Sequence, residues 1–128
     1  MENRIKVAVD AMGGDYAPAE AVKGAVAAVL EKENVEVLLV GKQEALEKEL
    51  ESCTYPKERI RIVPASEVIE TGEPPVAALR GKKDSSIVVG MKLVRKEEAD
   101  AFVSAGSSGA ILVGGTTIVG RIKGVERA

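Results

Sequence analysis

Apolar and polar residues change their spacing several times along the chain, and each change marks an expected element. Four short runs rich in Val and Ile have the length and composition of buried strands. They cover residues 5–9, 35–40, 60–63 and 101–104. Between these runs, apolar residues recur at three- and four-residue spacing, which predicts helices. The expected helices cover residues 18–33, 42–51, 76–81 and 108–120, together with one that begins at Ser85 or Ser86 and carries apolar residues as far as Val94.

The starts of these helices have recognisable residues. Pro18 suits the first turn of a helix, where its missing N–H is not needed. Asp15 is expected to cap the same helix, because a short polar side chain can accept hydrogen bonds from the first N–H groups. Residues 65–75 contain Gly72 and a Pro-Pro pair, which predicts a loop with at most one helical turn.

Strands that alternate with helices indicate βαβ units. The expected fold is therefore α/β, with three layers, a mostly parallel sheet and right-handed crossovers. The 128 residues suffice for one domain, and only 2% of them are aromatic, so the core must consist of Val, Ile, Leu and Ala. Such residues are typical of parallel strands that helices cover on both faces.

The expected helix 108–120 is apolar on nearly all sides and contains Gly114 and Gly115. A helix of this kind needs cover in water on most of its surface. Little sequence follows it, so we expect the cover to come from a partner chain or from the rest of a longer protein.

Composition removes several classes of function. A formal net charge of −2 and a pI near 5.3 do not favour nucleic acid as a partner. The chain has no His, which excludes a Ser-His triad and His-ligated metal, and we expect neither a metal nor a cofactor. The single Cys53 suits a reducing compartment. No apolar run is long enough to span a bilayer and no signal peptide is evident, so a cytoplasmic location is expected.

Two turns between a strand and a helix are rich in glycine and small polar residues, residues 10–15 and 104–109. Ligands bind beyond the carboxyl ends of parallel strands, where these turns are expected. Glycine lets backbone N–H groups approach an anion, so a phosphate is the expected guest. The candidate binding residues in the two turns are Asp10, Gly13, Gly14, Ser104, Gly106, Ser107, Ser108 and Gly109.

Each of these candidates also has a plain structural interpretation. The Gly-Ser-Ser-Gly sequence of residues 106–109 is equally consistent with a tight turn that requires positive φ. Asp10 is expected to orient backbone or a nearby cation, because a bare carboxylate repels phosphate. Lys82 and Lys83 offer positive charge for phosphate or for an acidic carrier protein, but most Lys pairs are simply solvated.

Four segments together resemble the PlsX-type phosphate acyltransferase family, in the order and spacing of that family. They are residues 7–18 (VAVDAMGGDYAP), 82–86 (KKDSS), 99–106 (ADAFVSAG) and 119–127 (VGRIKGVER). The resemblance covers essentially the whole chain. This sequence departs from the family where Ser107 and Ser108 replace an Asn and a Thr, and where Gly81 replaces a residue that is commonly basic.

The resemblance implies transfer of a fatty acyl group from acyl-acyl carrier protein to inorganic phosphate, in phospholipid synthesis. It also implies a homodimer, peripheral membrane contact and an isopropylmalate-dehydrogenase-like or phosphotransacetylase-like fold. Family members are more than twice as long, so residues 1–128 are expected to be the N-terminal part of one truncated domain. The main catalytic residues are then expected beyond Ala128, with Asp10 and Lys83 as supporting candidates, and this chain is expected to be inactive alone.

Two other functions remain open from the sequence. One is a non-catalytic anion-binding or assembly module that requires a partner chain, with helix 108–120 as its contact surface. The other is a nucleotide-dependent dehydrogenase, which the incomplete glycine fingerprint and the absence of an acidic residue at Val40-Gly41 disfavour.

Overall fold

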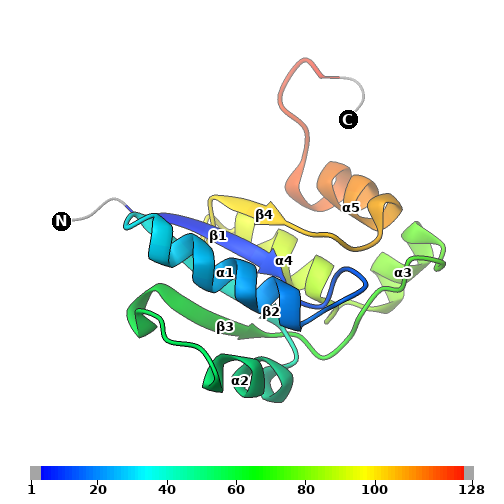
Figure 1. Ribbon diagram of the computed structural model, residues 1–128. Helices are drawn as coiled ribbons and strands as arrows, with labels where there is room; N and C mark the ends of the chain where they lie inside the picture. Colours follow the sequence, from blue (N-terminus) through cyan, green and yellow to red (C-terminus); the bar gives the residue numbers. More distant parts are fainter. Residues whose placement is uncertain (1–3, 126–128) are drawn as a thin grey trace.

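A computed structural model describes residues 4–125 as an α/β fold around one four-stranded sheet (Figure 1). The strands are β1 (Ile5–Asp10), β2 (Val35–Gly41), β3 (Ile60–Pro64) and β4 (Ala101–Val103). Their order in the sheet is β3-β2-β1-β4, and every pair is parallel. The α/β class and the parallel sheet expected from the sequence are confirmed.

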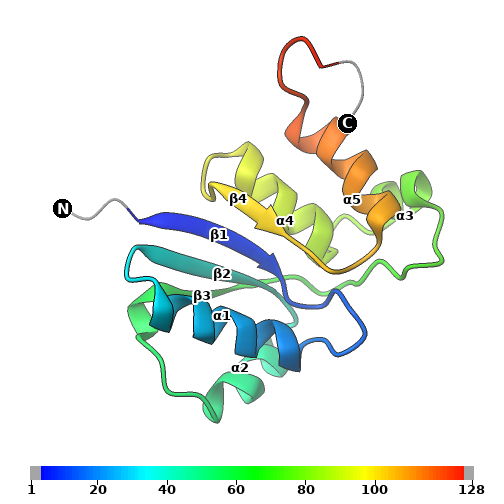
Figure 2. The same cartoon turned by 45° about the horizontal axis from the view of Figure 1, so that its top comes forward.

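Helices cover both faces of the sheet. They are α1 (Ala19–Glu31), α2 (Gln43–Glu51), α3 (Pro75–Gly81), α4 (Ser86–Arg95) and α5 (Ser108–Gly114). The helices α1 and α2 lie on one face, whereas α4 lies on the other face with α3 and α5 packed beside it (Figure 2). A short 3-10 turn at Lys57–Arg59 was not expected from the sequence.

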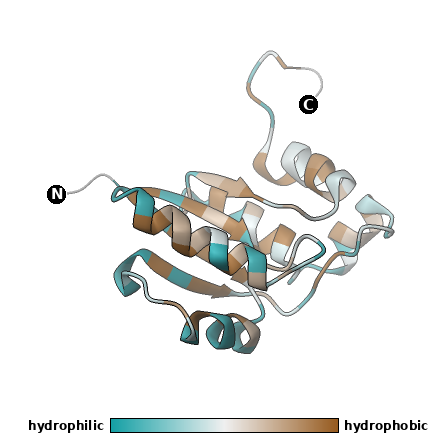
Figure 3. Ribbon diagram, viewed as in Figure 1, coloured by the Kyte–Doolittle hydropathy of each residue, from teal (hydrophilic) through white to brown (hydrophobic). Residues whose placement is uncertain are grey.

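Alternate residues of the strands form two separate cores, one on each face of the sheet. Val37 and Leu39 of β2 pack with Val22 and Val29 of α1 in the first core. Ala8 of β1 belongs to the second core, which α4 covers. The strands are accordingly mostly hydrophobic, whereas hydrophilic residues are frequent on α2 (Figure 3). The inner strand β2 is buried over its last five residues, as expected for a strand covered on both faces.

The helix starts agree with the sequence in one case and differ in another. Ser85 is the N-cap of α4, and its hydroxyl oxygen accepts a hydrogen bond from the backbone N–H of Val88. The prediction that Asp15 caps α1 is wrong, because α1 begins at Ala19 and Pro18 occupies the N-cap position. Asp15 lies further back in the turn and its side chain is exposed.

The segment expected as one helix over 108–120 is an α-helix only as far as Gly114. Gly115–Val119 forms a π-helical turn, in which the Gly120 N–H donates to the Gly115 carbonyl at 2.9 Å. The hydroxyls of Thr116 and Thr117 donate to carbonyls four residues earlier, a bond that bends helices. The expectation of one uniform helix was wrong here, because the apolar spacing does not show that threonine hydroxyls bond to the helix backbone.

In the part of the chain that the structure describes, no helix has both the length and the apolar character needed to cross a membrane. The last two residues of segment 119–127, which carries part of the family resemblance, lie outside the described residues.

Candidate functional site

The two glycine-rich turns meet at one edge of the sheet. Strand β1 ends at Asp10, and its parallel neighbour β4 ends at Val103, so both turns leave from the carboxyl end of the sheet. The backbones of Gly13 and Gly106 are in direct contact. A Cβ atom on Gly13 would lie 2.8 Å from the Gly106 nitrogen and 2.7 Å from Asp10 Oδ2. Glycine is therefore required at position 13 by the close approach of the turns.

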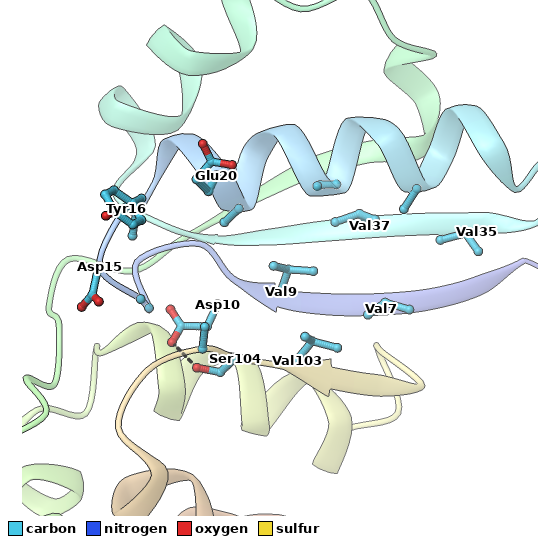
Figure 4. Close-up of a pocket in the computed structure, with 18 residues that line it drawn as sticks. Val7, Val9, Asp10, Asp15, Tyr16, Glu20, Val35, Val37, Val103 and Ser104 are labelled. Atoms are coloured by element: carbon cyan, nitrogen blue, oxygen red, sulfur yellow. Dashed lines mark hydrogen bonds between the residues drawn. The ribbon is translucent and has the colours of Figure 1, made fainter.

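The Asp10 carboxylate joins the two turns through hydrogen bonds. Its Oδ1 accepts from the backbone N–H of Met12 at 3.0 Å, within the first turn. Its Oδ2 accepts from the hydroxyl of Ser104 at 2.7 Å, as Figure 4 shows. Ser104 Oγ in turn accepts from the backbone N–H of Gly106 at 3.0 Å. Asp10 is 3% exposed and its partners are half-buried, so the network is partly shielded from water and holds both turns in one arrangement.

This network defines what Ser104 can do. Its hydroxyl proton points to Asp10 and its oxygen accepts from Gly106, so in this arrangement the proton is not available to an anion. Ser104 acts as a link between β1 and the second turn. Asp10 likewise orients the Met12 backbone, while both of its carboxylate oxygens accept hydrogen bonds from the protein.

The rest of the second turn divides between packing and exposure. Ser107 is the N-cap of α5, and its hydroxyl oxygen accepts from the Ala110 N–H at 3.3 Å. Gly109 lies against α3, since a Cβ there would be 2.7 Å from Pro75 Cγ. Only Ser108 of these three residues is exposed. The small size of Gly109 thus permits helix packing, whether or not the turn also binds an anion.

The two lysines expected near the site differ in their surroundings. Lys82 Nζ lies 2.7 Å from Glu73 Oε2 and donates to the Val68 carbonyl, also at 2.7 Å. The hydrogen bond from Lys82, and a second one from the Glu70 N–H, hold the pKa of Glu73 below its ordinary value. Lys83 is exposed. Among residues 4–125, no hydrogen bond or ion pair joins either lysine to the glycine turns.

A groove of about 540 Å³ begins at the joined turns and continues along β1. Its polar end contains Asp10, Ser104 and the exposed side chains of Asp15 and Glu20. Gly14 lies there too, with a φ of 96° in the left-handed region that favours glycine. The remaining length of the groove is apolar, with side chains of β1, β2 and β4 as the floor and α1 as one wall (Figure 4). Sequence reasoning did not predict this groove, although the small residues Ala21, Gly24 and Ala28 recur on one side of α1 and Ala17 precedes the helix.

The described residues contain no cluster of three or more His, Cys, Asp or Glu side chains suited to a metal ion. The site therefore consists of two backbone turns, the buried carboxylate of Asp10, the linking hydroxyl of Ser104 and the exposed carboxylates of Asp15 and Glu20.

Comparison with known proteins identifies the family to which these turns belong. Residues 5–128 match the model of a family described as "Fatty acid synthesis protein". The chain belongs to this family. The phosphate acyltransferase of Alkaliphilus oremlandii is 50% identical over 96% of this chain, and that of Clostridium kluyveri is 52% identical over 94%. The phosphate acyltransferase of Halothermothrix orenii is 45% identical over 96% of the chain.

The match covers nearly all of this chain but only part of each relative. The chain spans 36% of the length of the Alkaliphilus and Clostridium proteins and 37% of the Halothermothrix protein. The family is one of acyltransferases of fatty acid and phospholipid synthesis, as expected from the resemblance in the sequence. Both glycine turns lie within the matched stretch of the family.

Proposed function

We propose that this chain contributes the phosphate-binding turns of an enzyme that transfers an acyl group from acyl-acyl carrier protein to inorganic phosphate. Membership of the acyltransferase family supports the reaction class, and the names of the relatives support phosphate as the acceptor. One structural observation carries the assignment of the site. The turns 10–15 and 104–109 are fixed to each other by the hydrogen bonds of Asp10 and Ser104.

The proposed reaction places definite demands on such a site. A phosphate oxygen attacks the thioester carbonyl carbon, the carbon–sulfur bond breaks, and the carrier-protein thiolate leaves and takes up a proton. The site must hold the phosphate close to the thioester and stabilise the negative oxygen that forms on the carbonyl. Backbone N–H groups of glycine-rich turns meet both demands without a charged side chain. The reaction as proposed uses only protein groups and the two substrates.

Asp10 and Ser104 act in this proposal as positioning residues. Both oxygens of the Asp10 carboxylate already accept hydrogen bonds, from the Met12 N–H and the Ser104 hydroxyl, so the side chain is held in place when phosphate arrives. The turns then present Gly14 to the anion at the polar end of the groove, with Gly13 beside it. Gly106 supports this arrangement from behind, because its N–H already donates to Ser104 Oγ. Ser108 is the exposed hydroxyl of the second turn and a candidate direct donor to phosphate. Lys83, also exposed, attracts the acidic partners to this edge of the sheet.

The proposal also includes the setting of the enzyme. Since the chain spans little more than a third of its relatives, we propose that it is inactive alone and that further catalytic groups come from the remaining length. The family resemblance adds a cytoplasmic homodimer with peripheral membrane contact. Light scattering on the complete protein and sedimentation with anionic vesicles test these two properties.

The reaction is tested by the release of carrier-protein thiol from palmitoyl-acyl carrier protein. We would compare this chain with a chimera, defined as the Alkaliphilus oremlandii phosphate acyltransferase with its matched stretch replaced by this chain. Phosphate-dependent release by the chimera and none by the chain alone are expected. Ser104→Ala in the chimera is expected to raise the KM for phosphate on the order of tenfold, with little change in the KM for the acyl substrate. Release that does not depend on phosphate would contradict the proposal.

A further inference from the structure

The face of the sheet that carries α1 is covered over β2 and β3 but not over β4. Residues of β1 and β4 pair as Val7 with Ala101 and Val9 with Val103. These residues line the groove or its edge, and Val103 is 55% exposed although it lies in a strand. On the opposite face, the neighbouring Phe102 packs against α4. The groove therefore exposes apolar sheet surface that parallel sheets normally cover with a helix.

The wall of the groove has the shape that close helix packing needs. Ala17, Ala21, Gly24 and Ala28 of the α1 region line it, and all of them have small side chains or none. Nothing lies within 4 Å of the position where a Cβ atom of Gly24 would be. Because the separation of two packed helices depends on the side chains between them, such a wall lets another helix lie close to α1.

The outer edge of β4 has unpaired backbone groups in the part of the chain that the structure describes. The Asp100 N–H donates to the Lys6 carbonyl, towards β1, at 2.7 Å. Lys6 and Ala8 of β1 face β4, and the register of Ala8 with Phe102 directs the N–H groups of Ala101 and Val103 to β1. The N–H and C=O groups of Phe102 are therefore the ones that point to the outer edge. No described strand lies on that side, since β4 ends the order β3-β2-β1-β4. This edge is suited to pairing with a further strand.

The position of α5 indicates the direction in which such a strand would pair. After β4 the chain enters α5, which packs beside α4 on the face opposite α1 (Figure 2). The crossover from β3 through α4 to β4 uses this same face and moves across the sheet in one direction. A right-handed crossover through α5 continues that movement and places the next parallel strand at the free edge of β4.

We propose that the β4 edge and the apolar groove together form the docking surface for the part of a family protein that lies outside the matched stretch. That part supplies a strand parallel to β4 and an apolar helix that lies in the groove between α1 and β4. Nearly two thirds of the length of each relative is outside the match, which is ample for both elements. The apolar length of the groove is thus an internal interface in a full-length family member, while its polar end stays open at the glycine turns.

A second copy of this chain fits the surface less well. Copies related by a twofold axis bring identical edges together, and two β4 strands would then run antiparallel. Each copy would offer a strand of only three residues and no helix for the other groove. The crossover through α5 instead requires a parallel neighbour, which a segment of the same polypeptide provides.

Cysteine labelling tests this proposal without any measurement of enzyme activity. In a Cys53→Ser background, Gly24→Cys places a thiol in the groove, and Lys23→Cys places one on a side of α1 that does not line the groove. In this chain alone, both thiols are expected to react rapidly with a maleimide. In the chimera, labelling of Gly24→Cys is expected to slow at least about tenfold, while Lys23→Cys stays within about twofold.

Two outcomes would overturn the proposal. Equally fast labelling of Gly24→Cys in the chimera would show that nothing covers the groove. Protection that grows with concentration in this chain alone would assign the groove to a second copy. Because the new thiol itself could hinder packing, amide exchange without substitutions at Gly24 provides a second measurement. The Phe102 amide is expected to exchange rapidly in the chain and at least about tenfold more slowly in the folded chimera.

Discussion

The hydroxyl of Ser104 donates to the carboxylate of Asp10 at 2.7 Å, although the two residues are 94 positions apart in the chain. One residue ends β1, and the other follows β4. Their hydrogen bond therefore depends on the pairing of these two strands and connects both glycine turns at a buried position. The arrangement explains how a site with no His and no metal cluster among its described residues keeps two flexible turns in register.

Removal of this link is expected to cost stability as well as phosphate affinity. Ser104→Ala leaves Oδ2 of Asp10 buried without its donor, which lowers the free energy of unfolding by about 1–3 kcal/mol. Urea denaturation of the chain measures the change. The matched control is Ser108→Ala in the same turn, where the exposed side chain should change stability by no more than about 0.5 kcal/mol. Equal effects of the two substitutions would contradict the role assigned to Ser104.

The sequence predicted the elements well because their signals are local. Each strand, and each α-helix apart from the end of α5, was expected within a few residues of its observed bounds. Val-rich runs and three- to four-residue spacing depend on neighbours in the chain, so they can be read from the sequence. The link between Asp10 and Ser104 was not predicted as a pair, because it requires the strand order β3-β2-β1-β4. Local patterns do not determine which strand lies beside β1.

Other features could not be predicted from the sequence, because they too depend on contacts or competing hydrogen bonds that the sequence pattern does not show. The partner of Lys82 is Glu73, in a loop that sequence patterns described only as irregular. The groove depends on which side of β4 remains uncovered, and this is a property of the assembled layers. The π-helical turn at Gly115–Val119 depends on side-chain hydrogen bonds of Thr116 and Thr117 that compete with the backbone pattern.

Two glycines in helices are expected to respond in opposite directions to the same substitution. Gly90 of α4 faces Phe102, and a Cβ there would lie 2.6 Å from Phe102 Cδ1, with another ring atom still closer. Gly90→Ala should therefore destabilise the chain by about 1–3 kcal/mol through overpacking. Gly24→Ala in α1 meets no atom within 4 Å and should stabilise it by about 0.5–1 kcal/mol. Thermal unfolding of both variants measures the difference, and a shift of the same sign in both would contradict this packing.

The pairing of Glu73 with Lys82 predicts a dependence of stability on pH. The hydrogen bond from Lys82 lowers the pKa of Glu73 from its ordinary 4.5, so the folded chain binds this proton more weakly than the unfolded chain does. A lowered pKa gives a contribution that is present above about pH 4.5 and is lost as the pH falls through the lowered value. Urea midpoints of the wild-type chain and Glu73→Gln should differ near pH 7 and converge as the pH falls below about 4.5 and through the lowered pKa of Glu73.

The comparison is made with a variant because Glu73 is not the only carboxyl with this behaviour. A hydrogen bond from the Ser66 hydroxyl lowers the pKa of Asp84, so the contribution of Asp84 to stability is also lost as the pH falls. Asp84 is present in both proteins, so its effect is removed by subtraction. Glu33→Gln, an exposed position in the turn between α1 and β2, is the control and should show no gap at either pH. A gap for Glu73→Gln that widens at low pH would have the wrong sign.

Lys83 is expected to act on binding and not on stability, because its side chain is exposed at the start of the segment that leads into α4. In the chimera, Lys83→Gln should raise the KM for acyl-acyl carrier protein about two- to fivefold at low salt, with kcat nearly unchanged. The effect should fade at about 0.5 M salt, because screening acts strongly on exposed charges. Lys48→Gln on α2 removes the same charge away from the glycine turns and should leave the KM unchanged. A loss that is equal in both variants, or that persists at high salt, would show that Lys83 does not attract the carrier protein to this edge of the sheet.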